Sequence, residues 1–119
     1  MEARQMIEVY AHEGNDFAVT AEYGEWKVGL LNHSERFSRF AQLERHLLTD
    51  EVFVLLCGSA ILYTEREELP MESGKIYNVP AGVWHHIVVS EDATVIVVEN
   101  RNTSIENTEK KYFDEKENI

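Results

Sequence analysis

Two stretches of this sequence decide its fold: residues 44–58, ERHLLTDEVFVLLCG, and residues 74–85, GKIYNVPAGVWH. Each combines a histidine with a short apolar run, and glycine or proline interrupts each run. Outward from them, short apolar runs separated by Gly, Pro, Asn or Asp turns recur between residues 26 and 100. A series of about seven to nine short strands of this kind predicts an all-β sandwich or barrel.

The spacing within the two stretches predicts a cluster of polar side chains. Glu44 and His46 are two residues apart, so they share a face if they lie on a strand. If residues 47–50 form a four-residue hairpin loop, Glu51 lies directly opposite His46 and joins them on that face. His85 begins a later strand directly after a turn, and a barrel can place that strand beside the hairpin. We therefore expect these four side chains to lie close together.

The two stretches resemble the paired signature motifs of the cupin superfamily. The positions that match are His46, Glu51 and Gly58 in the first motif, and Gly74, Pro80, Gly82 and His85 in the second. The resemblance covers about residues 40–100 and implies a double-stranded β-helix, a cupin-type barrel of jelly-roll form. It also implies that His46, Glu51 and His85 are metal ligands.

Glu44 departs from the family pattern, because it stands where the family has its first histidine. Glutamate also binds metal, so a site of Glu44, His46, Glu51 and His85 for Mn, Fe, Ni or Zn is one interpretation. Without a metal, the carboxylates of Glu44 and Glu51 would repel each other, and one would hold a proton. The alternative is therefore a metal-free acid–base pair or a satisfied polar network that lines a cavity.

Composition excludes several classes of function. The net charge is −11, with 11 Lys and Arg against 22 Asp and Glu, so the basic face of a nucleic-acid-binding protein is not expected. No apolar stretch approaches the roughly 20 residues that span a membrane, and residues 1–6 do not read as a signal peptide. With Cys57 as the single cysteine, no intrachain disulfide can form. These features predict a cytoplasmic protein.

The chain is expected to divide into an N-terminal arm or edge strands (1–25), a barrel (26–100) and a polar, disordered C-terminal tail (101–119). The runs at 52–56 and 95–98 are apolar on both faces, so something must cover the second face. A partner subunit is one candidate, and we predict a homodimer; the alternative is that the N-terminal arm or the tail covers this face. His86 should lie on the surface or at a subunit contact, because alternation separates it from His85, and Cys57 should be buried.

Three functions remain open at this point. The first is a small metal-dependent enzyme that acts on a small organic metabolite. The second is a metal-free module that binds a small metabolite or sugar without catalysis, and the third is an interaction protein with an inert barrel. The sequence names neither the substrate nor the reaction, because one fold hosts many activities.

Overall fold

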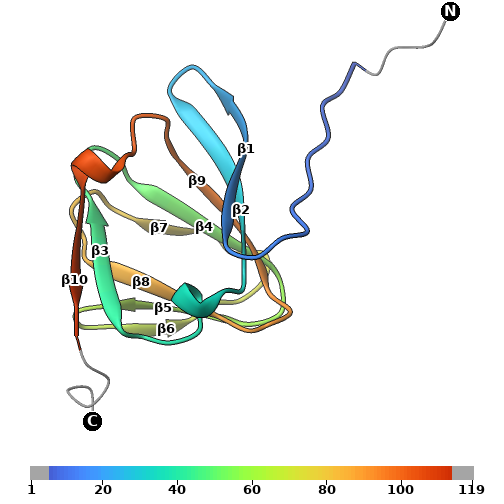
Figure 1. Cartoon of the computed structure of the whole chain (residues 1–119). Coiled ribbons are helices and arrows are strands. Elements are labelled where there is room, and N and C mark those ends of the chain that lie inside the picture. Colours follow the sequence, from blue (N-terminus) through green and yellow to red (C-terminus); the bar gives the residue numbers. More distant parts are fainter. Residues whose placement is uncertain (1–5, 114–119) are drawn as a thin grey trace, which may run out of the picture.

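In the computed structural model, which describes residues 6–113, ten strands form two five-stranded antiparallel sheets that face each other as a barrel (Figure 1). One sheet has the strand order β1-β2-β9-β4-β7, and the other has the order β10-β3-β8-β5-β6. The all-β prediction is therefore confirmed. The strands are β1 Phe17–Tyr23, β2 Trp26–Asn32, β3 Gln42–His46, β4 Glu51–Cys57, β5 Ala60–Thr64, β6 Glu68–Pro70, β7 Tyr77–Val79, β8 His85–Val89, β9 Thr94–Asn100 and β10 Thr108–Tyr112.

The barrel interior is apolar at one end and polar at the other. On β9, Val95, Val97 and Glu99 alternate onto the inner face, and all three are buried. The register pairs Glu99 with Glu51 on the neighbouring strand, at the polar end. The core is a cluster of buried apolar side chains: Leu31, Phe37, Phe53, Leu55, Ala60, Leu62, Met71, Val79, Ile87, Val89, Ala93, Val95 and Val97. The polar end is therefore the part of the interior where chemistry can take place.

The predicted hairpin between β3 and β4 is wrong. These strands belong to different sheets, so residues 47–50 carry the chain from one sheet to the other. His46 and Glu51 nevertheless meet, because one ends β3 and the other begins β4 at the same end of the barrel, and both point inward. Their proximity follows from facing sheets and not from direct cross-strand pairing.

The two sequence motifs are joined by backbone contacts beside this crossing. The Gly82 N–H donates to the carbonyl oxygen of His46 over 2.8 Å. The Ala81 N–H donates to the Asp50 carboxylate over 2.9 Å. Gly82 has a φ of 83°, a conformation that glycine adopts without the steric cost other residues meet. The turn before His85 is therefore fixed to the end of β3.

The last glycine of the first motif has a packing role. Gly58 has a φ of 73°, and a Cβ atom there would lie 2.6 Å from Ala93 Cα. Both the backbone conformation and the space exclude a side chain. This explains why a glycine follows the strand that begins at Glu51 and ends at Cys57.

Both ends of the described chain add strands to the barrel sheets. β1 pairs with β2, and β10 pairs with β3 from Thr108 opposite His46 to Tyr112 opposite Gln42. The expectation of a disordered tail is therefore wrong for residues 105–112, which form the 3-10 helix η2 (Ile105–Asn107) and β10. The prediction for 114–119 lies outside the described residues. Residues 7–10, which lie in the segment expected to be an arm or edge strands, form no strand.

The first sheet has an apolar outer face. Val52, Val54, Ile96 and Val98 alternate with the inward residues and are only partly buried, and Leu56 is exposed. These side chains account for the two-sided apolar runs in the sequence. Among residues 6–113, no helix has the length and hydrophobicity needed to cross a membrane.

Candidate functional site

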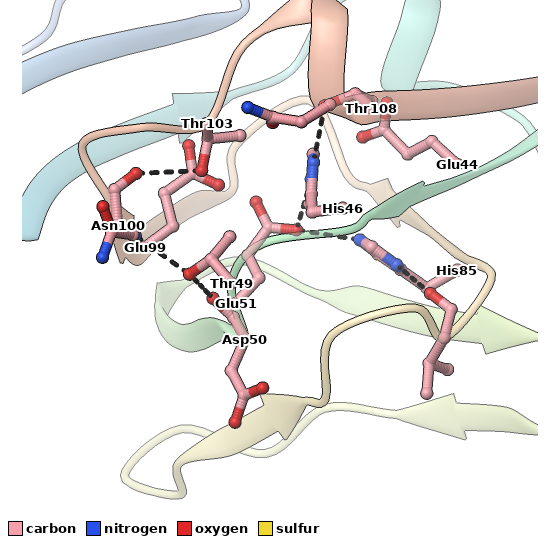
Figure 2. A network of polar contacts seen from close by, with 12 residues as sticks. Glu44, His46, Thr49, Asp50, Glu51, His85, Glu99, Asn100, Thr103 and Thr108 are labelled. Atoms are coloured by element: carbon pink, nitrogen blue, oxygen red, sulfur yellow. Dashed lines mark hydrogen bonds and ion pairs between the residues drawn. The ribbon is translucent and has the colours of Figure 1, made fainter.

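Three of the four residues predicted as ligands meet at the polar end of the barrel (Figure 2). His85 Nε2 lies 2.8 Å from Glu51 Oε1, and His46 Nε2 lies 3.2 Å from the same oxygen. All three residues are buried. β3 and β8 of one sheet supply the two histidines, and β4 of the facing sheet supplies the glutamate. One carboxylate oxygen thus faces two imidazole nitrogens.

The outer nitrogen of each imidazole is held by a neighbouring group. His85 Nδ1 lies 2.9 Å from the Val83 carbonyl oxygen. Because a carbonyl only accepts hydrogen bonds, Nδ1 is the donor in this contact. His46 Nδ1 lies 2.9 Å from Thr108 Oγ1, a contact that β10 provides. Support of the second ring nitrogen in this way is typical of metal-binding histidines, because it fixes the ring and the tautomer.

The charges of the cluster are strongly coupled. Burial by itself would raise the pKa of Glu51, but the hydrogen bonds and positive charges of His46 and His85 outweigh it and hold that pKa far below its usual range. Burial opposes protonation of both histidines, yet the Glu51 carboxylate outweighs it and raises the pKa of each. Without a metal, the cluster is therefore a buried carboxylate that stabilises imidazolium groups.

Glu44 stands at the outer side of this cluster. It is paired with His85 across β3 and β8, and its carboxylate lies within 4.8 Å of the ligand nitrogens of His46 and His85. Arg36 approaches it at 3.9 Å. The prediction that this glutamate shares the inner face with His46 is therefore confirmed.

Glu99 also belongs to the cluster and was missed by sequence reasoning. It is 8% exposed, and its carboxylate lies within 4.8 Å of the ligand atoms of His46 and Glu51. Burial, followed by the negative charge of Glu51, raises the pKa of Glu99 to about 7. Lys27 Nζ lies 3.6 Å from Glu99 Oε1 and partly offsets this charge. The interior therefore holds three carboxylates beside two histidines.

Two other predictions for single residues were wrong. His86 is only 2% exposed, on the outer face of the second sheet, where its ring stacks with Phe37 and Phe40. The loop between β2 and β3 covers a face that was expected to be open. Cys57 is exposed, because a β-bulge between Leu55 and Cys57 breaks the alternation that begins at Glu51.

A pocket of about 410 Å³ opens beside the cluster. It is lined by Glu44, His46, Ser104, Ile105, Thr108 and Lys110. A larger pocket of about 480 Å³ lies between β5, β6 and β7, and none of the candidate ligands lines it. Of these two pockets, the smaller one is lined by residues of the cluster, namely Glu44 and His46.

Three solved structures illustrate what the fold resembles. A cupin-2 domain protein from Shewanella frigidimarina has a TM-score of 0.62 and 24% identity, over 78% of this chain and 85% of the other. Pac13, a Streptomyces nucleoside dehydratase, has a TM-score of 0.68 and 13% identity, over 85% and 82%. KdgF from a Halomonas species has a TM-score of 0.58 and 20% identity, over 71% and 77%.

The fold is therefore that of the cupins, as the two motifs implied. No protein-family model matches the sequence, and no curated protein matches it. At these identities the likeness defines the fold and leaves the activity to be argued from the site.

Proposed function

We propose that this chain is a small metal-dependent enzyme that acts on a small organic metabolite. His46, Glu51 and His85 would hold a divalent metal ion, with Glu44 as a further ligand. Nitrogen and carboxylate oxygen donors in this combination suit Mn, Fe, Ni or Zn. A metal ion bound there would polarise a substrate carbonyl or activate water or dioxygen.

The observation that carries this proposal is the way two imidazoles face one carboxylate oxygen. Because His85 Nδ1 donates to Val83, neutral His85 would point a lone pair at Glu51 Oε1, only 2.8 Å away. A proton or a metal ion must therefore lie between them. His46 Nε2 is also buried and has no hydrogen bond of good geometry, although it lies 3.2 Å from the same oxygen. A single proton on His85 leaves His46 unsatisfied, whereas one metal ion serves all three groups.

The protein side chains would bind and orient the substrate. The pocket beside Glu44 and His46 brings a small molecule to the inner cluster, and Ile105 gives it an apolar contact. Lys110, on the same wall, offers a cation to an anionic substrate group. Thr108 would keep His46 Nε2 directed inward through its contact with Nδ1.

A metal-free binding module is the second candidate, and one observation favours it. The raised pKa values of His46 and His85 mean that protons can take the place of a metal ion beside Glu51. Among the structural neighbours, Pac13 is seen with uridine, a small metabolite. In this reading, Glu44, His46 and His85 serve as hydrogen-bonding groups.

Metal content distinguishes these candidates. The protein should be purified without a chelator or a histidine tag, beside His85→Ala and beside His33→Ala, which removes a histidine outside the cluster. Stoichiometric Mn, Fe, Ni or Zn in the wild type and in His33→Ala, but not in His85→Ala, is the expected result. No metal in the wild type after reconstitution with each ion would contradict the metal-dependent function. Circular dichroism checks that His85→Ala folds, and His85→Gln replaces it if it does not.

We also propose that the apolar outer face of the first sheet forms a homodimer. Val54 and Ile96 lie at its centre, and they are paired across β4 and β9. Burial of such a face by a second copy would account for its hydrophobic character.

The cytoplasmic location proposed from the single cysteine fits the solvent-exposed thiol of Cys57, which a reducing compartment keeps free.

A further inference from the structure

Glu99 is a buried acid that the proposed ligand set does not use. It is not one of the positions that the motif resemblance implies, and β9 brings it to the polar end from the opposite side to Glu44 (Figure 2). Its Oε2 atom is buried without a hydrogen-bond partner. A buried carboxylate oxygen without a partner is costly, so its presence calls for an explanation.

The neighbours of Glu99 give only partial compensation. Lys27 Nζ lies 3.6 Å from Oε1, too far for a hydrogen bond, and the same ammonium group also donates to the Thr103 carbonyl over 3.4 Å. Burial, the negative charge of Glu51 and a hydrogen bond with Glu51 all oppose ionisation of Glu99 and raise its pKa. Nothing among the described residues therefore neutralises the carboxyl group of Glu99 fully.

We propose that Glu99 is a ligand of the metal ion, in addition to the residues that the motif resemblance implies. This inference rests on the proposed metal site. The carboxylate of Glu99 lies within 4.8 Å of the ligand atoms of His46 and Glu51. In the same way, the carboxylate of Glu44 lies within 4.8 Å of the ligand atoms of His46 and His85. Glu44 and Glu99 therefore belong to two groups of potential ligand atoms that have His46 in common.

Charge and coordination number support the same assignment. The negative charges of three carboxylates would be offset by one divalent cation together with the Lys27 ammonium beside Glu99 and the Arg36 guanidinium beside Glu44. Two imidazoles and three carboxylates fill most of an octahedral shell, whereas structural zinc sites take four ligands in a tetrahedron. The site is therefore expected to prefer Mn²⁺ or Fe²⁺ over Zn²⁺ more strongly than a site with three histidines and one glutamate, because carboxylates favour harder ions.

The test measures metal binding by the whole chain and requires no substrate. Chelator-treated wild type, Glu99→Gln and Glu91→Gln are titrated with Mn²⁺ and Co²⁺ by calorimetry. Glu91→Gln removes the same charge from an exposed turn. Loss of Glu99 should weaken Mn²⁺ binding by roughly 10–100-fold or more, the range measured even for residues that only support a ligand. It should also alter the visible absorption bands of the Co²⁺ form, while Glu91→Gln matches the wild type.

Each other outcome has a distinct meaning. If Glu99→Gln binds Mn²⁺ within about twofold of the wild type and keeps its Co²⁺ spectrum, Glu99 is not a ligand, and the proposed site stands. Weaker binding with an unchanged spectrum would mean that Glu99 acts only through its charge, which also overturns this inference. A wild type that binds neither ion overturns both proposals. Glu99→Asp, which keeps the charge beside Lys27 and shortens the side chain, replaces Glu99→Gln if that variant does not fold.

Discussion

The N–H of Gly82 donates a hydrogen bond to the carbonyl oxygen of His46 over 2.8 Å, and this contact fixes the turn before His85 to the strand end that carries His46. The two imidazoles therefore share one backbone support, although His85 lies 39 positions after His46 in the sequence. The geometry of the site depends on the turn as well as on the ligands.

The two glycines of the motifs should differ in their tolerance of alanine. Gly82→Ala should cost about 1 kcal/mol, because its φ is 83° but a Cβ there meets nothing within 4 Å. Gly58→Ala should cost clearly more, since its Cβ would also lie 2.6 Å from Ala93 Cα. Urea denaturation of both variants measures the difference in free energy of unfolding. Equal costs would show that the space around Gly58 relaxes freely.

Removal of the central carboxylate should be far more damaging than removal of a surface carboxylate. Glu51→Gln leaves His46 and His85 without their buried counter-charge, and we expect a loss of about 3 kcal/mol in the metal-free protein. Glu109→Gln breaks an exposed ion pair with Arg45 and should cost at most about 1 kcal/mol. Thermal unfolding of the two variants provides the comparison. Similar melting temperatures would argue against a charged inner cluster.

Thr108 should tune metal affinity without contacting the metal. Thr108→Val removes the partner of His46 Nδ1, so the ring is less firmly held, and metal affinity should fall by roughly 10-fold. Thr20→Val, which removes a hydroxyl bonded to the Val28 carbonyl on the other sheet, is the matched control and should leave affinity unchanged. Calorimetric titration with Mn²⁺ measures both. Equal affinities in the two variants would exclude this role for β10.

The metal-free protein should lose stability as the pH rises above about 6. The folded-state pKa values of His46 and His85 are raised above 6.5, so their contribution is complete below pH 6.5 and disappears as the pH passes through the raised values. The pKa of Glu99 is raised from 4.5 to about 7, so its contribution to stability is also lost as the pH rises from 4.5 to about 7. Glu51 has the opposite sign, because its lowered pKa gives stability above pH 4.5 that is lost in acid.

Melting temperatures from pH 4 to pH 8 test this prediction. The metal-free protein should melt highest at roughly pH 4.5–5, because the contribution of Glu99 is already being lost between pH 4.5 and about 7, and its melting temperature should decline toward pH 8. Saturation with metal should reduce or reverse that decline, because deprotonated imidazoles are the form that binds metal. A metal-free melting temperature that rises steadily from pH 6 to pH 8 would contradict the assigned pKa directions.

A charge in the apolar outer face should separate the proposed dimer. Val54→Glu places a carboxylate at the centre of that face, and we expect the chain to sediment as a monomer. Leu69→Glu, at an exposed position on β6 of the other sheet, should leave the oligomeric state unchanged. Analytical ultracentrifugation of the wild type and both variants decides the matter. A monomeric wild type would contradict the proposed homodimer.

The sequence predicted the fold class and the inner cluster because the alternation of side chains along a strand and the positions of turns are local properties. His46 and His85 end or begin a strand beside a turn, so their spacing carries structural information. The route by which Glu51 reaches His46 is not local. A four-residue connection fits a hairpin or a crossing between facing sheets, and only the pairing of β3 with β8 and β10 distinguishes them.

The alternation of inward and outward side chains gave wrong or no predictions where the apolar pattern was ambiguous or where a bulge interrupted it. Glu99 follows a run that is apolar on both faces, so alternation did not show that it points inward. Its one signal was a lone acid that ends a buried run. The bulge before Cys57 shifted the alternation of side chains on β4, so Cys57 does not share the inner face with Glu51. The strand TEKKY, β10, looked like a tail because its side chains are polar, yet its backbone pairs with β3.

One divalent ion should lie between His46, Glu51 and His85. Crystals grown with Mn²⁺ and measured near the manganese absorption edge test it directly through the anomalous difference map. We expect one strong peak per chain, within bonding distance of His46 Nε2, His85 Nε2 and a Glu51 oxygen. A map without a peak at that position, from crystals in which the cluster is well ordered, would contradict it.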